Sequence, residues 1–186
     1  MSEILDINFL DFKKQAELMA ISIGWFEAIT GLPVSIRGAD KNRTGIRVNI
    51  GDMDNEGRNF TAFSAFKPSE FGIYFAAEKV ARMRALGEVS SANSANDKLR
   101  FPGAIAVTLN GYVYSCGVSG LRSEEDVFIA VMNLSCALQM SPWDVCANVR
   151  QHGGVLPDCF MDIDHYLHAA VNSMRVEDCL PHSLAA

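Results

Sequence analysis

Apolar residues recur along this chain with two different periods, and these periods predict its helices and strands. A spacing of three to four residues is typical of an amphipathic helix, and strict alternation is typical of a strand with one covered face. The predicted helices are residues 8–30, Pro68 to about Leu86, a segment that begins near Ser123, Ser141 to His152, and Phe160–Val176. The predicted strands are Pro33–Arg37, Gly45–Ile50, Asn59–Phe66, Ala104–Leu109 and Tyr112–Val118. Because helices interrupt a set of short strands, we expect an α+β fold with a mostly antiparallel sheet.

The segment Pro102–Leu138 contains the strongest local signals. Asn110-Gly111 separates two alternating apolar runs, and both residues tolerate the positive φ angles of a tight hairpin turn. A second turn leads directly into a helix, for which Ser123 is the expected N-cap. Asp126 stands three residues after Ser123, which is the spacing of a capping box. We therefore expect a hairpin, a glycine turn and a capped helix, in that order.

Capping and turn residues predict where other elements begin and end. Asn8 is the expected N-cap of the first helix, and Gly31 is its expected stop. Ser141, which is followed by a proline, is the expected start of a later helix. The small and polar segment Ser90–Lys98 has the composition of a mobile loop or lid.

The composition is that of an ordinary globular protein, and the charge argues against two classes of partner. The chain has 186 residues, of which 49% are hydrophobic and 20% are charged, and its formal net charge is −6. Nucleic acids and anionic membrane surfaces both attract basic patches, so we expect neither as a partner. No apolar run reaches the ~20 residues of a membrane span, and no signal peptide is evident.

The cysteines indicate a reducing compartment. The chain has five of them, and no two have the C-x-x-C spacing of a zinc or redox motif. This pattern is typical of reduced thiols that pack as small apolar side chains. We therefore expect a cytoplasmic protein.

Glycines at fixed places in the segment 102–138 carry a resemblance to a known family. Gly103 leads a strand, Gly111 lies in the hairpin turn, and the turn Gly117-Val118-Ser119-Gly120 precedes Asp126. This pattern resembles the GlcG/HbpS-like family, also called the haem-degrading domain family. The segment Ala76-Ala77-Glu78-Lys79-Val80 is similar to the family's mid-chain helix, in which a lysine follows small residues.

The resemblance implies a fold, an assembly and a ligand. The implied fold is a profilin-like α-β-α sandwich with a five-stranded sheet, and the implied assembly is a homo-oligomer. Residues 1–140 are expected to form this domain, and residues 141–186 a C-terminal helical extension packed on it. The implied function is binding of haem, with or without its oxidative breakdown.

Lys79 and Asp126 are the candidate catalytic residues, because they match the family's lysine and acidic residue. A desolvated lysine can bind a carboxylate or act as a base. Each residue also has a structural interpretation. Asp126 fits the acidic position of a capping box, and Lys79 fits a surface lysine whose stem covers apolar area.

The glycine turn and one helix edge supply candidate ligand-binding residues. Backbone N–H groups just before a helix N-terminus can hold a carboxylate, which makes Gly117, Ser119 and Gly120 candidates. Ser119 lacks the glycine two positions later that a nucleophile elbow needs, so we do not expect it to act as a nucleophile. Glu78 and Arg82, four residues apart on a helix, are further candidates and are expected to pair.

A metal ion or a haem iron needs donor side chains, and His165 and His168 are the candidates. They stand three residues apart and therefore share a face of the last predicted helix. No third ligand is evident, and no C-x-x-C-H haem attachment motif is present.

Three functions are compatible with these features. The first is a small-ligand-binding protein that takes haem. The second is a cofactor-independent enzyme that moves a proton on a small carboxylated metabolite, with Lys79 and Asp126 in its pocket. The third is a non-catalytic accessory subunit that forms a homo-oligomer through its apolar helices.

Overall fold

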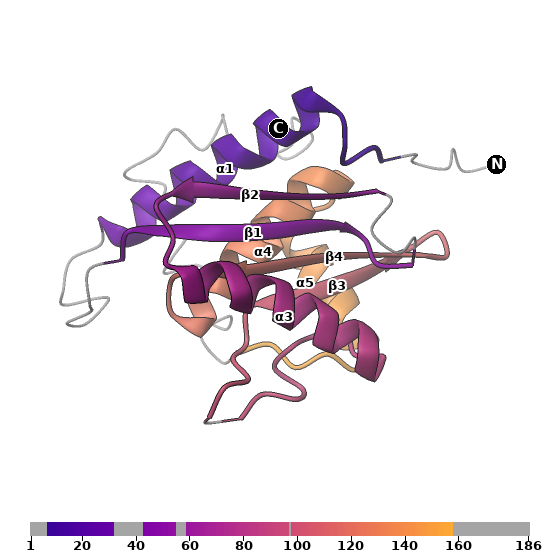
Figure 1. Ribbon diagram of the computed structural model, residues 1–186. Coiled ribbons are helices and arrows are strands. Elements are labelled where there is room, and N and C mark those ends of the chain that lie inside the picture. The colour runs from indigo at the N-terminus through magenta and orange to yellow at the C-terminus, as the bar shows by residue number, and fades with distance from the viewer. Residues whose placement is uncertain (1–6, 32–42, 55–58, 97, 158–186) are drawn as a thin grey trace.

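An antiparallel sheet forms the centre of the fold. The computed structural model describes residues 7–31, 43–54, 59–96 and 98–157, and within these ranges the sheet has four strands in the order β2-β1-β4-β3. The strands are β1 (Gly45–Asp52), β2 (Phe60–Phe66), β3 (Ala104–Leu109) and β4 (Tyr112–Ser119) (Figure 1). The strand predicted at residues 33–37 lies outside the described residues, so a fifth strand stays a prediction.

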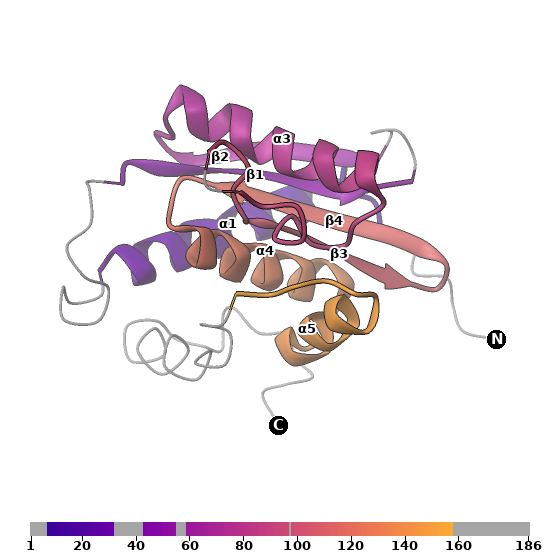
Figure 2. The ribbon, with the colours of Figure 1, turned by 90° about the horizontal axis from the view of Figure 1, so that it is seen from below.

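Helices cover both faces of this sheet and give three layers (Figure 2). Helix α3 (Glu70–Leu86) lies on one face, and α1 (Phe12–Thr30) and α4 (Ser123–Leu138) lie on the other. Helix α5 (Pro142–Gln151) packs against α4 and β3. The predicted α+β fold is confirmed for the described residues, whereas the helix predicted at residues 160–176 lies outside them.

The core lies between the sheet and the pair α1 and α4. Alternate residues of β1 point into it, as the sequence pattern predicts, and Ile46, Val48 and Ile50 are fully buried. Helix α4 is buried around most of its circumference, because the sheet, α1 and α5 surround it. None of the helices in the described ranges combines the length and the apolar character that crossing a bilayer requires.

The caps of two helices test the predicted boundaries. Helix α1 starts one turn later than predicted, because the carboxylate of Asp11 accepts a hydrogen bond from Lys14 N at 3.0 Å. The prediction of Asn8 as the N-cap is therefore wrong; Asn8 caps a turn that precedes the helix. The prediction of Ser141 is confirmed, since its hydroxyl accepts from Asp144 N at 3.0 Å.

The predicted hairpin is present between β3 and β4. Asn110 and Gly111 form its turn with φ angles of 53° and 83°. Leu109 and Tyr112 pair directly across the turn, as a two-residue hairpin requires. This turn sets the register of β4, which in turn pairs with β1.

The segment predicted as a mobile loop or lid, Ser90–Lys98, is hydrogen-bonded to the rest of the fold where the structure describes it. Two backbone hydrogen bonds join its beginning to β3, from Ser91 N to Ala104 O at 2.9 Å and from Ala106 N to Val89 O at 2.8 Å. The side chain of Asn93 bonds to Gly153 O at 2.9 Å and to Val155 N at 2.8 Å. The small polar residues thus form hydrogen-bonding bridges within a loop, and the mobility of this loop stays a prediction.

Helix α3 approaches β4 most closely at Gly117. A Cβ atom on Gly117 would lie 2.6 Å from Val80 Cγ2 and 2.7 Å from Ala76 O. Because Gly117 has no side chain, α3 can pack directly against β4 at this position.

We predict that Gly117→Ala lowers the free energy of unfolding by about 2 kcal/mol, because the added methyl must push α3 away from β4. Urea denaturation followed by circular dichroism measures this loss. Gly111→Asn is the matched control, since position 111 has open space around it and asparagine tolerates its positive φ. An equal loss in both variants would contradict the predicted contact.

Candidate functional site

A cavity of about 690 Å³ lies where β4 ends and where α3 and α4 begin. Ser69 and Gly72 reach it from the first turn of α3, and Arg122 and Ser123 from the first turn of α4. Its lining also includes the turn residues Ser119 and Gly120, the aromatic residues Phe71, Phe75 and Phe101, and the charged residues Arg43, Lys79, Glu124 and Asp126. The glycine turn and the two candidate catalytic residues thus share one cavity.

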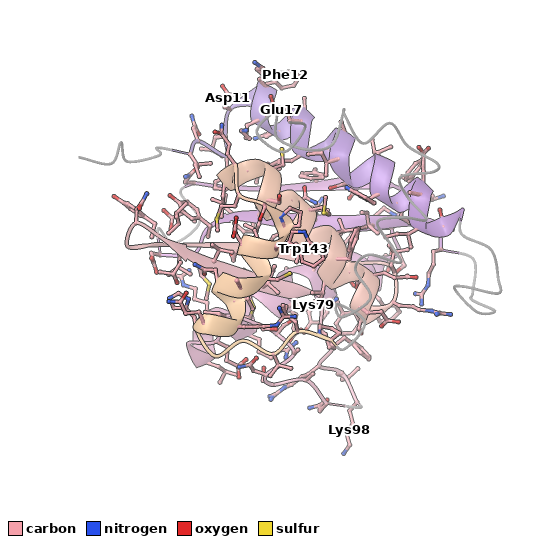
Figure 3. All side chains as sticks on the ribbon, turned by 180° about the vertical axis from the view of Figure 1, so that it is seen from behind. Asp11, Phe12, Glu17, Lys79, Lys98 and Trp143 are labelled. Atoms are coloured by element: carbon pink, nitrogen blue, oxygen red, sulfur yellow. The ribbon has the colours of Figure 1, made fainter. Side chains whose placement is uncertain are left out.

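Lys79 and Asp126 form a buried ion pair in the wall of this cavity. Lys79 Nζ lies 3.0 Å from Asp126 Oδ2, and the two side chains are 1% and 4% exposed. Figure 3 shows Lys79 inside the molecule, whereas Lys98 reaches its periphery. The interpretation of Lys79 as a surface lysine is therefore wrong.

Backbone groups complete the surroundings of this pair. Lys79 Nζ also donates to Val118 O at 2.7 Å, and the second carboxylate oxygen of Asp126 accepts from Leu121 N at 3.0 Å. Burial raises the pKa of the Asp126 carboxyl above its usual value, while the Lys79 ammonium and the Leu121 N–H act in the opposite direction. The pair links α3, the end of β4 and the start of α4.

Gly103 makes room for the ammonium. Its φ angle is +135°, and a Cβ atom there would collide with Lys79 Nζ and come within 2.7 Å of Val118 O. The glycine that leads β3 in the sequence pattern is thus the residue that lets a charged group lie beside the sheet.

The predicted capping box at the start of α4 is displaced by one residue. Arg122 is the N-cap in place of Ser123, and Glu125 accepts from Arg122 N at 3.0 Å. The Asp126 carboxylate does not cap the helix; it accepts hydrogen bonds from Lys79 and from the Leu121 N–H instead. The capping interpretation of Asp126 is therefore wrong, because the adjacent glutamate takes the role one position earlier.

Glu78, Arg82 and Gly117 do not line this cavity. The predicted Glu78–Arg82 pair is present, with Arg82 Nε 2.7 Å from Glu78 Oε1. The same guanidinium donates to Ser91 O at 2.9 Å and to Phe101 O at 3.0 Å. Arg82 therefore anchors the segment that follows α3, which includes Phe101.

The metal candidates His165 and His168 lie outside the described residues. Within the described ranges, no group of three or more His, Cys, Asp and Glu side chains has a geometry that would hold a metal ion.

Several lining residues were not found by sequence reasoning. Arg43 stands in a segment that reads as a turn, and Phe75 and Phe101 read as helix core and loop. Arg122 could have been predicted as a lining residue, because it directly precedes the helix start that the sequence predicted.

Comparison with known proteins shows similarity in fold. No protein-family model and no curated protein matches the sequence. The structure is similar to that of PduOC in complex with haem, with a TM-score of 0.47, 15% identity, and coverage of 67% of this chain and 92% of the other. It is also similar to the Klebsiella pneumoniae protein ORFY of the family DUF336, with a TM-score of 0.43, 16% identity, and coverage of 66% and 91%. Both matches are similarities in fold.

We predict that Lys79→Met destabilises the protein by about 3–5 kcal/mol at neutral pH, because it leaves the Asp126 carboxylate buried without its counter-ion. Protonation of Asp126 removes that charge, so the loss should shrink as the pH is lowered. Urea denaturation at neutral and mildly acidic pH measures both effects.

Lys14→Met is the matched control for this prediction. Lys14 pairs with Glu17 at 2.9 Å, but these side chains are 24% and 41% exposed, so a loss well under 1 kcal/mol is expected. The double variant Lys79→Met/Asp126→Leu should recover most of the stability, because it removes both buried charges. A pH-independent loss in Lys79→Met would contradict the ion-pair interpretation.

We predict that Arg82→Gln makes the hydrogen-bonded amides of Ser91 and Asn96 exchange about tenfold faster or more, because the loop loses its guanidinium anchor. Hydrogen–deuterium exchange measures this opening. Arg84→Gln on the same helix should leave both amides unchanged. Slow exchange retained in Arg82→Gln would mean that the bonds to β3 hold the loop by themselves.

Proposed function

We propose that the cavity between α3 and α4 binds a small organic anion, namely a carboxylate with an apolar body. The observation that carries this proposal is that two helix N-termini and the cationic side chains of Arg43, Lys79 and Arg122 meet at one cavity. Helix N-termini favour negative charge because their first N–H groups lack partners within the helix.

The balance of charged side chains that line the cavity favours an anionic ligand. Asp126 is compensated by Lys79 at 3.0 Å. Arg43 and Arg122 supply guanidinium groups, each with donors enough to bind a carboxylate alongside the contacts it already makes. Glu124 is the remaining acidic side chain of the lining, so the cationic groups outnumber the acidic ones.

The apolar part of the ligand has a matching surface. Phe71, Phe75 and Phe101 line the same cavity, and the rings of Phe75 and Phe101 meet edge to face with centroids 5.3 Å apart. Aromatic walls with a few convergent polar groups are typical of small-molecule sites. An aromatic or branched carboxylate therefore fits better than a small inorganic anion.

Haem belongs to this ligand class through its propionates, and PduOC was crystallised with haem. Cationic groups and aromatic walls suit a propionate and a porphyrin ring. Haem iron, however, takes an axial His, Cys, Met or Tyr, and the described residues that line the cavity include none of these. We therefore place haem among the ligands to be tested, with His165 and His168 as its proposed donors.

A second candidate is the proton-transfer enzyme, and it is favoured by the position of two ionisable groups. Lys79 and Asp126 both line the cavity, and burial raises the pKa of the Asp126 carboxyl above its usual value. In this reading the pair would relay a proton to or from the bound carboxylate's α-carbon. The ligand-binding proposal comes first, because Lys79 already uses two of its three donors inside the protein.

The ligand proposal is tested by NMR titration of ¹⁵N-labelled protein with phenylacetate and with its neutral match, phenylacetamide. We expect phenylacetate to shift the amide signals of Ser119, Gly120 and Leu121 with saturation, and phenylacetamide to bind about tenfold more weakly or less. Arg122→Gln should weaken phenylacetate binding by about tenfold, since it removes a charge-assisted contact. Arg84→Gln, which lies outside this cavity, is the matched control.

Equal affinity for the acid and the amide would overturn the proposal, as would an equal effect of the two arginine variants. A haemin titration followed by its Soret band separates the ligand classes. Saturation at one haemin per chain would favour haem, whereas a featureless titration alongside phenylacetate binding would leave the small carboxylate as the ligand.

A further inference from the structure

Two aromatic rings form a corner in the apolar wall of the first cavity. Phe75 belongs to α3, and Phe101 belongs to the segment that leads into β3. Their ring centroids are 5.3 Å apart, and their ring planes stand at 86° to each other. A flat ligand ring in such a corner can stack against one ring and meet the other at a right angle, and aromatic rings prefer both arrangements. An aliphatic group of equal size gains nothing from this geometry.

Arg82 holds the backbone of Phe101 in place, although Arg82 does not line the cavity itself. Arg82 Nη2 donates to Phe101 O at 3.0 Å. Arg82 Nη1 donates to Ser91 O and to Ser94 Oγ, both at 2.9 Å. The Glu78 carboxylate accepts from Arg82 Nε at 2.7 Å and from Nη2 at 3.4 Å. All five donors of the guanidinium are thus engaged, which fixes its orientation.

This anchor is sheltered from water. Arg82 is 8% exposed, and Ser94, which accepts from it, donates in turn to Glu88 Oε2 at 2.6 Å. Charge-assisted hydrogen bonds in a sheltered network hold their partners firmly. Phe101 is therefore in position before a ligand arrives, and a pre-organised wall avoids the cost of ordering that wall on binding.

We propose that the first cavity selects carboxylates with a flat aromatic ring over aliphatic carboxylates of the same size, and that Arg82 sets this selectivity by positioning Phe101. The selectivity rests on the proposed anion-binding function and narrows the ligand of that site to aryl carboxylates. Arg82 is a positioning residue, because it acts on the ligand only through Phe101. Its loss should therefore change the choice between ligands, whereas the binding of the carboxylate end is left to other groups.

A second cavity beside α3, of about 600 Å³, provides a control on the same helix. Its polar floor includes Asp52, which is 4% exposed, and Ser115, whose buried hydroxyl has no hydrogen-bond partner among the described residues. Phe60 is the one aromatic side chain among the described residues that line it, so it contains no corner of two rings. Arg84 lines this cavity and not the first, which makes Arg84→Gln the matched control for Arg82→Gln.

The test is an NMR titration with phenylacetate and cyclohexylacetate, which have the same charge and the same number of carbon atoms but differ in the flatness of the ring. Burial of apolar area alone favours cyclohexylacetate, because its saturated ring is the more hydrophobic. The ring corner reverses this order, so we expect phenylacetate to bind about threefold to tenfold more tightly. The amide signals of Ser119, Gly120 and Leu121 report the binding of both ligands.

The variants test whether Arg82 acts through Phe101. Arg82→Gln and Phe101→Leu should each reduce the preference for phenylacetate to about twofold or less, because each disrupts the corner. The double variant should show no further reduction, since both changes act on the same ring. Arg84→Gln should keep the full preference. A merely structural loss in Arg82→Gln would weaken both ligands equally and leave the preference intact, and that result would contradict the positioning role.

Equal or tighter binding of cyclohexylacetate to the unmodified protein would overturn the proposed selectivity and leave the anion-binding function in place. Failure of both carboxylates to bind would overturn that function, and the selectivity with it. Phe101→Leu changes a side chain that is 37% exposed, so it tests the corner even where Arg82→Gln destabilises the protein. An unchanged preference in Phe101→Leu would overturn the selectivity as well.

Discussion

The buried ion pair between Lys79 and Asp126 is the interaction on which the arrangement of this molecule depends. Each charge is removed from water, so each is tolerated only because the other lies 3.0 Å away and backbone groups complete its hydrogen bonds. The lysine comes from one side of the sheet and the aspartate from the first turn of a helix on the other side. A single charge pair therefore fixes how the two helical layers meet at the end of β4.

The spacing between α3 and the sheet explains why both cavities exist. At Gly117 the helix touches the strand so closely that no side chain fits between them. Away from this contact, small residues line the cavities, Gly72 and Gly120 in the first and Ala77 and Ala81 in the second. The first cavity opens toward the helix N-termini and is rich in cationic groups, whereas the second has a polar floor with a buried carboxylate. One close contact thus divides the space under α3 into two chemically different sites.

Periodicity predicted most of the elements, because a half-buried helix or strand must repeat its apolar residues. The hairpin at Asn110 and Gly111 was equally predictable, since few residues accept its φ angles. The local roles of polar residues were harder to predict. Asp126 and Glu125 are adjacent acids at a helix start, and only their three-dimensional partners decide which one caps the helix and which one pairs with Lys79. Arg82 and Ser115 show the same limit, because neither the anchoring of a loop nor an unpartnered hydroxyl leaves a periodic signal.

The segment that follows α3 covers part of one edge of the sheet. β3 is the last strand on its side of the sheet among the described residues, and such a strand presents a row of unpaired backbone groups to other molecules. Val89 and Ser91 occupy part of that row through their hydrogen bonds to Ala106 and Ala104. The loop thus shields an edge that would otherwise be open to pairing between chains, and it protects this all-antiparallel sheet from growth into an aggregate.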